Sequence, residues 1–526
     1  MRSNPQVSVA TQGATTSNQS SKSGIWWALV IAAGVFAVHI ATISKYGYFR
    51  DELYYIACSN HLDWGYVDQP PMIVLVTWLI RHVLGESLFA IRILPALANA
   101  GVVVLTAFMA KEMGGRKFAQ WFSALCMACA GIYLILGHLL TMNVFEPLIW
   151  MGCAYVLILM IKRNNPKLWV WFGLLAGIGL ETKYSILIFG LGIVVGLVLT
   201  EERRLLWSKW LLVGGAIALL IFLPNLVWNV QHHWPFVELM HNIKESGRDI
   251  ALSPGQFVAQ QFLLMNPIIA PVWIAGLLFL LFSRRLREYR ALGLGYVVSL
   301  LVLIVMKGKN YYLAPAYPML LAAGGIATEA LITRPRVSWL KPVAVTAVLV
   351  VTVLLLPAFA PVLSVEGFLS YQDKLPFNIP RNEKGHLGAA LPQYYADDFG
   401  WEEMTAAVAK VYNGLSPEER SKTAIYCHNY GEAGAIDFFG RKYGLPASIC
   451  PHQNYFFWGP RNYTGEIVIL VGSDSLETER RHFDQVDPVA DLDNPYAITF
   501  ENRPILLARG LKVNLQDVWP KLKAWD

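Results

Sequence analysis

Eleven apolar runs, each long enough or almost long enough to cross a bilayer, lie between residues 25 and 363. A membrane-spanning helix needs about 20 predominantly apolar residues. The runs are 25–43, 93–110, 118–137, 145–161, 168–180, 184–199, 210–228, 257–282, 291–306, 311–332 and 342–363. Only 15% of the residues are charged, against roughly a quarter in soluble domains. We therefore predict an α-helical polytopic membrane protein with about 11 transmembrane helices.

Basic residues gather in every second connection between these runs, and each of these five connections carries three or four of them. They are Lys111, Arg116 and Lys117; Lys162, Arg163 and Lys167; Arg203, Arg204 and Lys209; Arg284, Arg285, Arg287 and Arg290; and Arg334, Arg336 and Lys341. Lysine and arginine are enriched in loops on the cytoplasmic side of a membrane. We therefore predict a cytoplasmic N-terminus and an extracytoplasmic C-terminal region. Because the net charge of +6 is spread over these connections, a nucleic-acid partner is not expected.

Composition divides the chain into three regions. Residues 1–24 are rich in Ser, Thr, Gln and Asn and are predicted to be a disordered cytoplasmic tail. Residues 25–363 form the predicted transmembrane domain, whose first external loop is 44–92. Within that loop the apolar run 72–80 is too short to cross, so we predict a helix that lies on the outer membrane interface. Residues 364–526 have the composition of an ordinary soluble domain.

The C-terminal region alternates strand-like and helix-like segments, which predicts a small extracytoplasmic α/β domain. The expected strands are 423–428 and 466–472, and the expected helices are 432–443 and 476–483. Cys427 and Cys450 lie 23 positions apart in this domain. Outside the cytoplasm a disulfide between them could persist, and two free buried thiols are the equal alternative.

The first external loop holds an acidic pair, Asp51 and Glu52, a few residues beyond the first apolar run. Seven aromatic residues and two further acids accompany the pair: Tyr46, Tyr48, Phe49, Tyr54, Tyr55, Trp64, Tyr66, Asp63 and Asp68. One interpretation is an ordinary aromatic belt at the membrane interface with solvated carboxylates. The other is a carboxylate at membrane level that acts as general base for an acceptor hydroxyl or amine.

Several short motifs follow the acidic pair along the chain. They are TMNVFEP at 141–147, ETKYSILIF at 181–189, FLPNLVWNVQHHWPF at 222–236, KGKNYYLAPAYP at 307–318, YGEAG at 430–434 and YFFWGP at 455–460. With the Asp-Glu pair and a Pro-Pro turn, this ordered set resembles the GT-C-fold membrane glycosyltransferases. The resemblance is to their protein O-mannosyltransferase and lipid A aminoarabinose transferase types, and it extends from about residue 25 to about residue 510.

The resemblance implies inverting transfer of a sugar from a polyprenyl-phosphate carrier to an extracytoplasmic acceptor, at a bacterial inner membrane. The acceptor would be a glycolipid such as lipopolysaccharide, another glycan or a protein. By analogy, Asp51 would be the general base, and Glu52 would orient Asp51 or the acceptor. Tyr54, Tyr55 and Asp68 would contact the substrates.

Two basic positions expected from the aminoarabinose transferases are not basic here. A lysine commonly precedes the Pro-Pro turn and an arginine follows the Asp-Glu pair, but this chain has Gln69 and Tyr54 at those places. Some other cation must then hold the carrier phosphate. Lys307 and Lys309 are the predicted substitutes, because their short external loop carries no acid and ammonium groups bind phosphate. Simple tolerance of lysine at the membrane surface is the alternative.

The remaining candidates lie near the predicted outer surface. Tyr311 and Tyr312 could pack on the prenyl chain or on the sugar. Lys183 could either pair with Glu181 or face the donor phosphate, and His233 at the end of the seventh run is a further candidate for substrate contact. Metal dependence varies across the fold, and residue spacing identifies no ligand set for a divalent metal ion.

Two other classes of function fit parts of the sequence. A transporter or flippase with an external domain would account for the spans and for the charged residues at bilayer depth. A structural membrane protein would use its external domain mainly to bind partners. The acidic and aromatic first loop is left unexplained by both, and it favours the enzyme.

Overall fold

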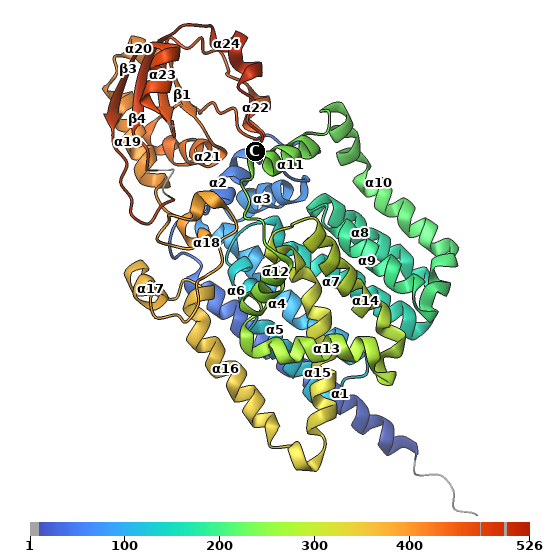
Figure 1. Cartoon of the computed structure of the whole chain (residues 1–526). Helices are drawn as coiled ribbons and strands as arrows, with labels where there is room; N and C mark the ends of the chain where they lie inside the picture. The colour runs from blue at the N-terminus through green and yellow to red at the C-terminus, as the bar shows by residue number, and fades with distance from the viewer. Residues whose placement is uncertain (1–9, 474, 499–501) are drawn as a thin grey trace, which may run out of the picture.

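The computed structural model of the chain describes residues 10–473, 475–498 and 502–526. Figure 1 shows a bundle of helices with a smaller domain of helices and strands at one end. The bundle helices are α1 (Ala10–Thr42), α4 (Leu88–Glu112), α5 (Lys117–Ala128), α6 (Gly131–Leu136), α7 (Met142–Arg163), α8 (Trp169–Thr182), α9 (Ile186–Val198), α10 (Lys209–Gln231), α12 (Pro254–Leu264), α13 (Ala270–Phe282), α14 (Arg290–Val305), α15 (Tyr317–Ile332) and α16 (Leu340–Phe359). Three shorter helices, α2 (Arg50–Cys58), α3 (Met72–Val83) and α11 (Pro235–Ser246), lie at the end that carries the smaller domain.

Seven helices of the described part are long and apolar enough to cross a membrane, and an eighth crossing counts if one bent pair is a single span. The two halves of that pair, Pro254–Leu264 and Pro267–Phe282, meet at 98°. The break falls where Pro267 lacks an N–H donor and Asn266 has a φ of 70°. The polytopic helical membrane protein is thus confirmed. The figure of 11 crossings stays a prediction, because α8 and α9 have only 14 and 13 residues.

Helix α1 starts earlier than the apolar run that predicted it. The helix begins at Ala10, well before Ile25. Adding residues to an existing helix avoids the cost of nucleation, so the span can propagate helix into the polar segment before it. The predicted disorder of 1–24 stays a prediction; the structure has helix from Ala10, and residues 1–9 lie outside the described part of the chain.

Close packing in the bundle fixes the connection that carries Lys309. A Cβ added at Gly276 of α13 would lie 1.9 Å from the carbonyl oxygen of Leu320 in α15, so only glycine permits this approach. In lipid, such van der Waals contacts between small residues are a main source of helix association. The 3₁₀ turn Asn310–Ala316 leads directly into α15. The anchored α15 therefore holds the adjoining Lys309 in place at the end of the bundle.

The smaller domain contains a four-stranded sheet in the order β1-β2-β4-β3. Its strands are β1 (Thr423–Cys427), β2 (Ile467–Val471), β3 (Phe483–Ala490) and β4 (Ile505–Leu511), of which β1 and β2 pair in parallel and β4 is antiparallel to both β2 and β3. Its helices are α17 (Val365–Gln372), α18 (Gln393–Ala396), α19 (Trp401–Gly414), α20 (Pro417–Lys422), α21 (Tyr430–Phe439), α22 (Tyr455–Trp458), α23 (Leu476–His482) and α24 (Leu515–Val518). The predicted α/β domain is confirmed.

The two cysteines of this domain are free thiols in the structure. Cys427 ends β1, and both Cys427 and Cys450 are buried. Of the two alternatives that the sequence left open, the structure therefore has the pair of buried thiols.

Helix α2 lies between the bundle and the smaller domain. One hydrophobic cluster joins Leu53 and Tyr54 of α2 to Ile425 of β1 and Ile436 of α21. A Cβ added at Gly434 would lie 3.0 Å from the backbone of Leu53, so α2 and α21 are in direct contact. Helix α2 therefore packs against both parts of the molecule.

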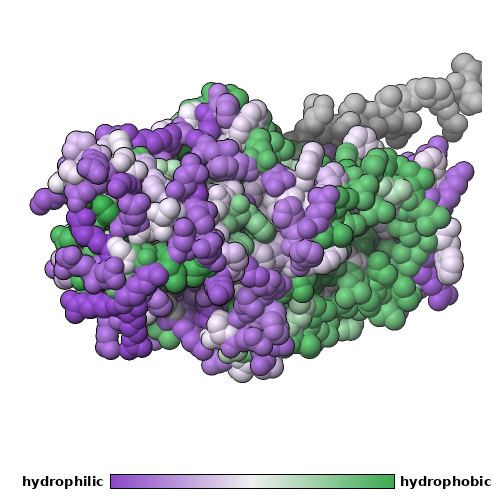
Figure 2. Space-filling view, turned by 90° about the horizontal axis from the view of Figure 1, so that it is seen from above, coloured by the Kyte–Doolittle hydropathy of each residue, from purple (hydrophilic) through white to green (hydrophobic). Residues whose placement is uncertain are grey.

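The surface of the molecule changes character from one side to the other. Figure 2 shows polar side chains over the left, where Figure 1 places the smaller domain, and apolar side chains over the right, where it places α8, α9 and α10. Leu187, Leu191 and Val194 of α9 and Leu212 and Leu220 of α10 are exposed. Soluble proteins rarely expose so large an apolar area, so this surface is that of a bundle embedded in lipid.

Candidate active site

The acidic pair of the first loop opens helix α2. Phe49 has extended backbone geometry, and its N–H donates to Glu52 Oε2 at 2.9 Å, which satisfies one of the free donors at the helix start. Successive residues of a helix point about 100° apart. Asp51 and Glu52 therefore enter different surroundings although they are neighbours in the chain.

Glu52 forms a fully buried ion pair with Arg92 of α4. Arg92 Nε donates to Glu52 Oε1 at 2.9 Å and Arg92 Nη2 donates to Oε2 at 2.8 Å, and both side chains are completely inaccessible. The Leu140 N–H donates to Oε1 as well, at 2.9 Å. Because these contacts saturate the carboxylate, its geometry favours a structural role that ties α2 to α4 over direct contact with a substrate.

Asp51 faces the boundary between the bundle and the smaller domain. Its side chain is 29% exposed, and its Oδ1 accepts a 2.8 Å hydrogen bond from the Tyr430 hydroxyl of α21. Arg50 Nε lies 3.9 Å from the same oxygen. Burial raises the pKa of Asp51, and Arg50 and Tyr430 oppose that rise. Oδ2 accepts no hydrogen bond from the described residues, so one oxygen of a basic carboxylate is available.

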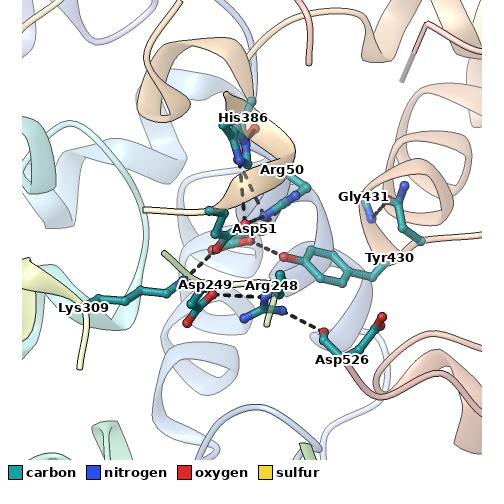
Figure 3. A network of polar contacts seen from close by, with 12 residues as sticks. Arg50, Asp51, Arg248, Asp249, Lys309, His386, Tyr430, Gly431 and Asp526 are labelled. Atoms are coloured by element: carbon teal, nitrogen blue, oxygen red, sulfur yellow. Dashed lines mark hydrogen bonds and ion pairs between the residues drawn. The ribbon is translucent and has the colours of Figure 1, made fainter. Parts of the chain in front are cut away.

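Three cations and three further carboxylates form a network around Asp51 (Figure 3). Arg50 lies 3.8 Å from Glu383 and 3.7 Å from Asp397. Lys309 Nζ lies 2.7 Å from Glu383 Oε1 and 3.5 Å from Asp249 Oδ1. The third cation, Arg248, lies 3.2 Å from Asp249. Burial raises the pKa of Glu383, but the cations Lys309, Arg50 and Arg248 outweigh it and the pKa is lowered overall.

A short backbone bridge brings one of these cations, Arg248, and one of the carboxylates, Glu383, to the site. Asp249 and Glu383 pair in antiparallel fashion, and the Ile250 N–H donates to the Asn382 carbonyl at 2.9 Å. The bridge joins the connection between α11 and α12 to the start of the smaller domain. It therefore places Arg248 and Glu383, which are far apart in the sequence, within one cluster.

The predicted contact residues Tyr54, Tyr55, Asp68 and Gln69 are largely buried beside Asp51. The Tyr54 hydroxyl donates to Asp68 Oδ1 at 3.0 Å, and its ring lies 4.6 Å from that of Tyr430. Burial raises the pKa of Asp68 to about 7. The Gln69 amide is fully buried and neither end forms a hydrogen bond with the described residues. These side chains form the floor beneath Asp51 and Tyr430.

Lys183 is in a second polar group close to the aromatic pair Tyr311 and Tyr312. Its Nζ donates to Asn143 Oδ1 at 2.6 Å and lies 3.5 Å from Glu146. It also lies 3.9 Å from the centre of the Tyr312 ring, a cation–π distance. The alternative pairing of Lys183 with its sequence neighbour Glu181 was wrong, because the C-cap of α8 turns the lysine toward α7.

Lys307 and His233 are not brought into the network. Both side chains are exposed, and neither forms a hydrogen bond or ion pair with the described residues. Lys309, by contrast, is paired with two carboxylates that come from elsewhere in the chain. No group of three or more His, Cys, Asp or Glu that could hold a metal ion occurs within residues 10–473, 475–498 and 502–526.

Reasoning from the sequence missed six members of the network: Arg50, Arg248, Asp249, Glu383, Asp397 and Tyr430. Arg50 directly precedes the acidic pair, so a search for a cation on either side of Asp51 would have found it. Tyr430 was part of a motif already singled out. Nothing in the local sequence marks Arg248 or Glu383, since their roles depend on a contact between distant segments.

The chain is similar in sequence to one family model and to one curated protein. The family model for dolichyl-phosphate-mannose-protein mannosyltransferases matches residues 68–228. The lipid A galacturonosyltransferase RgtD of Rhizobium johnstonii is 28% identical over 260 residues, which are 48% of this chain and 54% of that protein. The chain thus spans about half the length of the curated relative that it matches.

Solved structures extend the similarity to nearly the whole chain. ArnT from Cupriavidus metallidurans, bound to undecaprenyl phosphate, has a TM-score of 0.59 at 16% identity and covers 92% of this chain and 98% of its own. The chain has the GT-C fold. The apo oligosaccharyltransferase of Archaeoglobus fulgidus is a more distant structural match, with a TM-score of 0.50 at 12% identity. The match covers 81% of this chain and 64% of the oligosaccharyltransferase. The fold expected from the ordered motifs is thereby confirmed.

Proposed function

We propose that this GT-C-fold protein is an integral membrane glycosyltransferase that uses a polyprenyl-phosphate sugar as donor. The acceptor lies on the side of the smaller domain, outside the cytoplasm, and is a glycolipid, another glycan or a protein. The similarity to a lipid A galacturonosyltransferase and to a structure with bound undecaprenyl phosphate supports a lipid carrier and favours a lipid A-type acceptor.

The observation that carries the proposal is the position of Asp51. It is a partly exposed carboxylate with one available oxygen, and it lies beside Arg50 in a cluster that also holds Lys309 and Arg248. A base and several cations at the end of a membrane bundle are the groups that a phosphate-linked sugar donor and a neutral acceptor require.

The reaction follows from this arrangement. Asp51 takes the proton of the acceptor hydroxyl while the oxygen of that hydroxyl forms a bond to the anomeric carbon of the sugar. The bond between that carbon and the phosphate oxygen breaks, and the polyprenyl phosphate leaves with the electron pair. The cations stabilise the negative charge that develops on this leaving group. Attack opposite the leaving group inverts the anomeric carbon.

The donor phosphate must compete with carboxylates of the protein for the cations of the network. Lys309 is held by Glu383 and Asp249, so an incoming phosphate would replace at least one of these carboxylates. Lys183 with Tyr311 and Tyr312 forms a second cation-and-aromatic surface that could hold the carrier near the membrane. Lys307 and His233 are exposed and are assigned no contact here.

The orientation in the membrane is part of the proposal. Basic residues in alternate connections support a cytoplasmic N-terminus and an extracytoplasmic smaller domain. An alkaline phosphatase reporter fused after Asp526 should be active, and the same reporter inserted at Ser338 should be inactive. The opposite result would show that the smaller domain and the candidate site lie in the cytoplasm, which would contradict the proposed orientation.

The test of function uses the purified full-length protein in lipid vesicles. Undecaprenyl-phosphate sugars are supplied with lipid A, and mass spectrometry follows both the glycosylated acceptor and the released carrier phosphate. Joint appearance of the two products supports transfer. Movement of intact donor across the bilayer without cleavage would instead support a flippase and contradict the proposal. Comparison of lipid extracts from a deletion strain and its parent identifies the acceptor in cells.

A further inference from the structure

A hollow of about 700 Å³ lies at the end of the bundle away from the candidate active site. It is formed by the residues after α9 and by the segment that joins α13 to α14. Helix α9 begins just after Lys183, and α14 ends just before Lys309. Helix α9 ends at Val198 and α14 begins at Arg290, so the ends of these helices that line the hollow are the ends opposite to those beside Lys183 and Lys309.

Small residues bring these two helices together. A Cβ added at Gly196 of α9 would lie 2.3 Å from the carbonyl oxygen of Ala291 in α14, and one at Gly192 would lie 2.5 Å from that of Gly295. The spacing Gly192-x-x-x-Gly196 is typical of close contacts between helices in lipid. This contact fixes the connection after α9 against the one before α14 and so gives the hollow defined walls.

The lining of the hollow is rich in arginine. It contains five arginines and three glutamates, which leaves it positively charged. Glu201 pairs with Arg287, and Glu202 pairs with Arg204 outside the lining. Four of the lining arginines are then left without an anionic partner among the described residues, and one of these, Arg285, donates to the Gly114 carbonyl.

The other three, Arg203, Arg284 and Arg290, form neither an ion pair nor a side-chain hydrogen bond with the described residues. The Nε of Arg290 is buried and forms no hydrogen bond with the described residues. Leaving a buried charged donor unsatisfied is costly, so an anion that accepts its hydrogen bond would be stabilising. The lining is therefore built for a negatively charged ligand with several acceptor oxygens.

Apolar side chains adjoin the same hollow. Val198 and Leu199 belong to its lining, and these residues are 51% and 66% exposed. A soluble anion such as a nucleotide gains little from an apolar rim at the membrane surface. A phospholipid places its phosphate on the arginines and its acyl chains against the apolar rim, so it uses both features.

We propose that this hollow binds the phosphate headgroup of an anionic glycerophospholipid in the leaflet opposite the smaller domain. The lipid bridges the connections after α9 and before α14 and supplies the negative charge that the lining lacks. The site is separate from the proposed sugar transfer, and it holds whether or not the active-site assignment is correct.

The experiment is native mass spectrometry of the full-length protein released from micelles that contain phosphatidylglycerol, cardiolipin or phosphatidylcholine. The test variant is Arg284→Gln with Arg290→Gln. The matched control is Arg334→Gln with Arg336→Gln, two exposed arginines of another connection on the same side. We expect the wild type and the control to retain one anionic lipid, and the test variant to bind it at least about tenfold more weakly.

Two further arms make the outcome decisive. Arg203→Gln, a change at an exposed residue, should weaken retention several-fold with the fold intact, which guards against a double variant that fails to fold. Inorganic pyrophosphate is added as a soluble competitor and should not displace the lipid at equal concentration. Equal retention by test variant and control, equal retention of phosphatidylcholine, or preferential binding of pyrophosphate would each overturn the proposal.

Discussion

The Tyr430 hydroxyl donates a 2.8 Å hydrogen bond to Asp51 Oδ1 across the boundary between the smaller domain and the bundle. The Tyr430 ring also lies 5.3 Å from the guanidinium of Arg50, within cation–π range. One side chain of the smaller domain thus touches both the proposed base and the cation beside it. The smaller domain therefore contributes a side chain to the candidate active site.

Replacing Tyr430 by Phe tests this contribution. The hydrogen bond stabilises ionised Asp51, so its loss raises the pKa of Asp51 and leaves less of the base ionised at neutral pH. The acid limb of the pH–rate profile should then move to higher pH by about one pH unit. Tyr412→Phe, which removes a 3.3 Å hydrogen bond within the smaller domain, is the control and should leave the profile unchanged. A uniform loss of rate without a shift would contradict the assignment.

Arg92→Met should destabilise the protein strongly. It leaves Glu52 buried without its partner, and breaking such a buried pair costs roughly 3–5 kcal/mol. Lys162→Met breaks the exposed pair with Glu112 and should cost about 1 kcal/mol or less. Thermal unfolding in detergent, followed by circular dichroism, measures both. Similar melting temperatures for the two variants would show that the Glu52–Arg92 pair does not anchor α2.

Most of the fold could be predicted from the sequence because the patterns that indicate helices and strands are local. Apolar runs predicted the helices, and short strand-like segments placed β1 and β2 within one residue at each end. Strands β3 and β4 were not predicted. Strand β3 buries only Phe483 and Val486 fully, so it lacks the continuous apolar pattern of a central strand.

The site was predicted in part, for a physical reason that its residues show. Asp51 could be singled out because it lies beside an apolar run in an aromatic loop. Lys309 was expected to have no acidic neighbour, yet the structure pairs it with Asp249 and Glu383. Those partners lie about 60 and 74 positions away along the chain, and only the folded bridge between their segments brings them together.

Lys309 and Lys307 should now differ in their effect on the donor. Lys309→Met removes a cation from the network around Asp51, so the apparent KM for the polyprenyl-phosphate sugar should rise by about tenfold or more with a smaller change in kcat. Lys307→Met changes an exposed residue of the same loop and should alter donor kinetics by less than about twofold. Steady-state kinetics with varied donor concentration distinguishes the two variants. Equal effects of the two substitutions would contradict a specific role of Lys309 in donor binding.

Cys427 and Cys450 should resist alkylation in the folded protein. Both thiols are buried, and burial raises the pKa of each well above its usual range, which lowers the fraction of reactive thiolate. Without reductant, both should be labelled once the protein is unfolded in guanidinium chloride. Mass spectrometry of the labelled peptides makes the measurement, and an unlabelled linked pair after unfolding would show a disulfide.

The most direct test of the account is turnover by Asp51→Asn in reconstituted vesicles. The substitution keeps the shape of the side chain and removes its basicity, so release of polyprenyl phosphate should fall by at least about a hundredfold. Donor binding should be retained, and so should the melting temperature. Asp373→Asn, which changes an exposed acid at the end of α17, is the control and should turn over normally. A loss of this size in Asp51→Asn alone is the predicted result, whereas near-normal turnover at normal expression would contradict the assignment of Asp51 as the base.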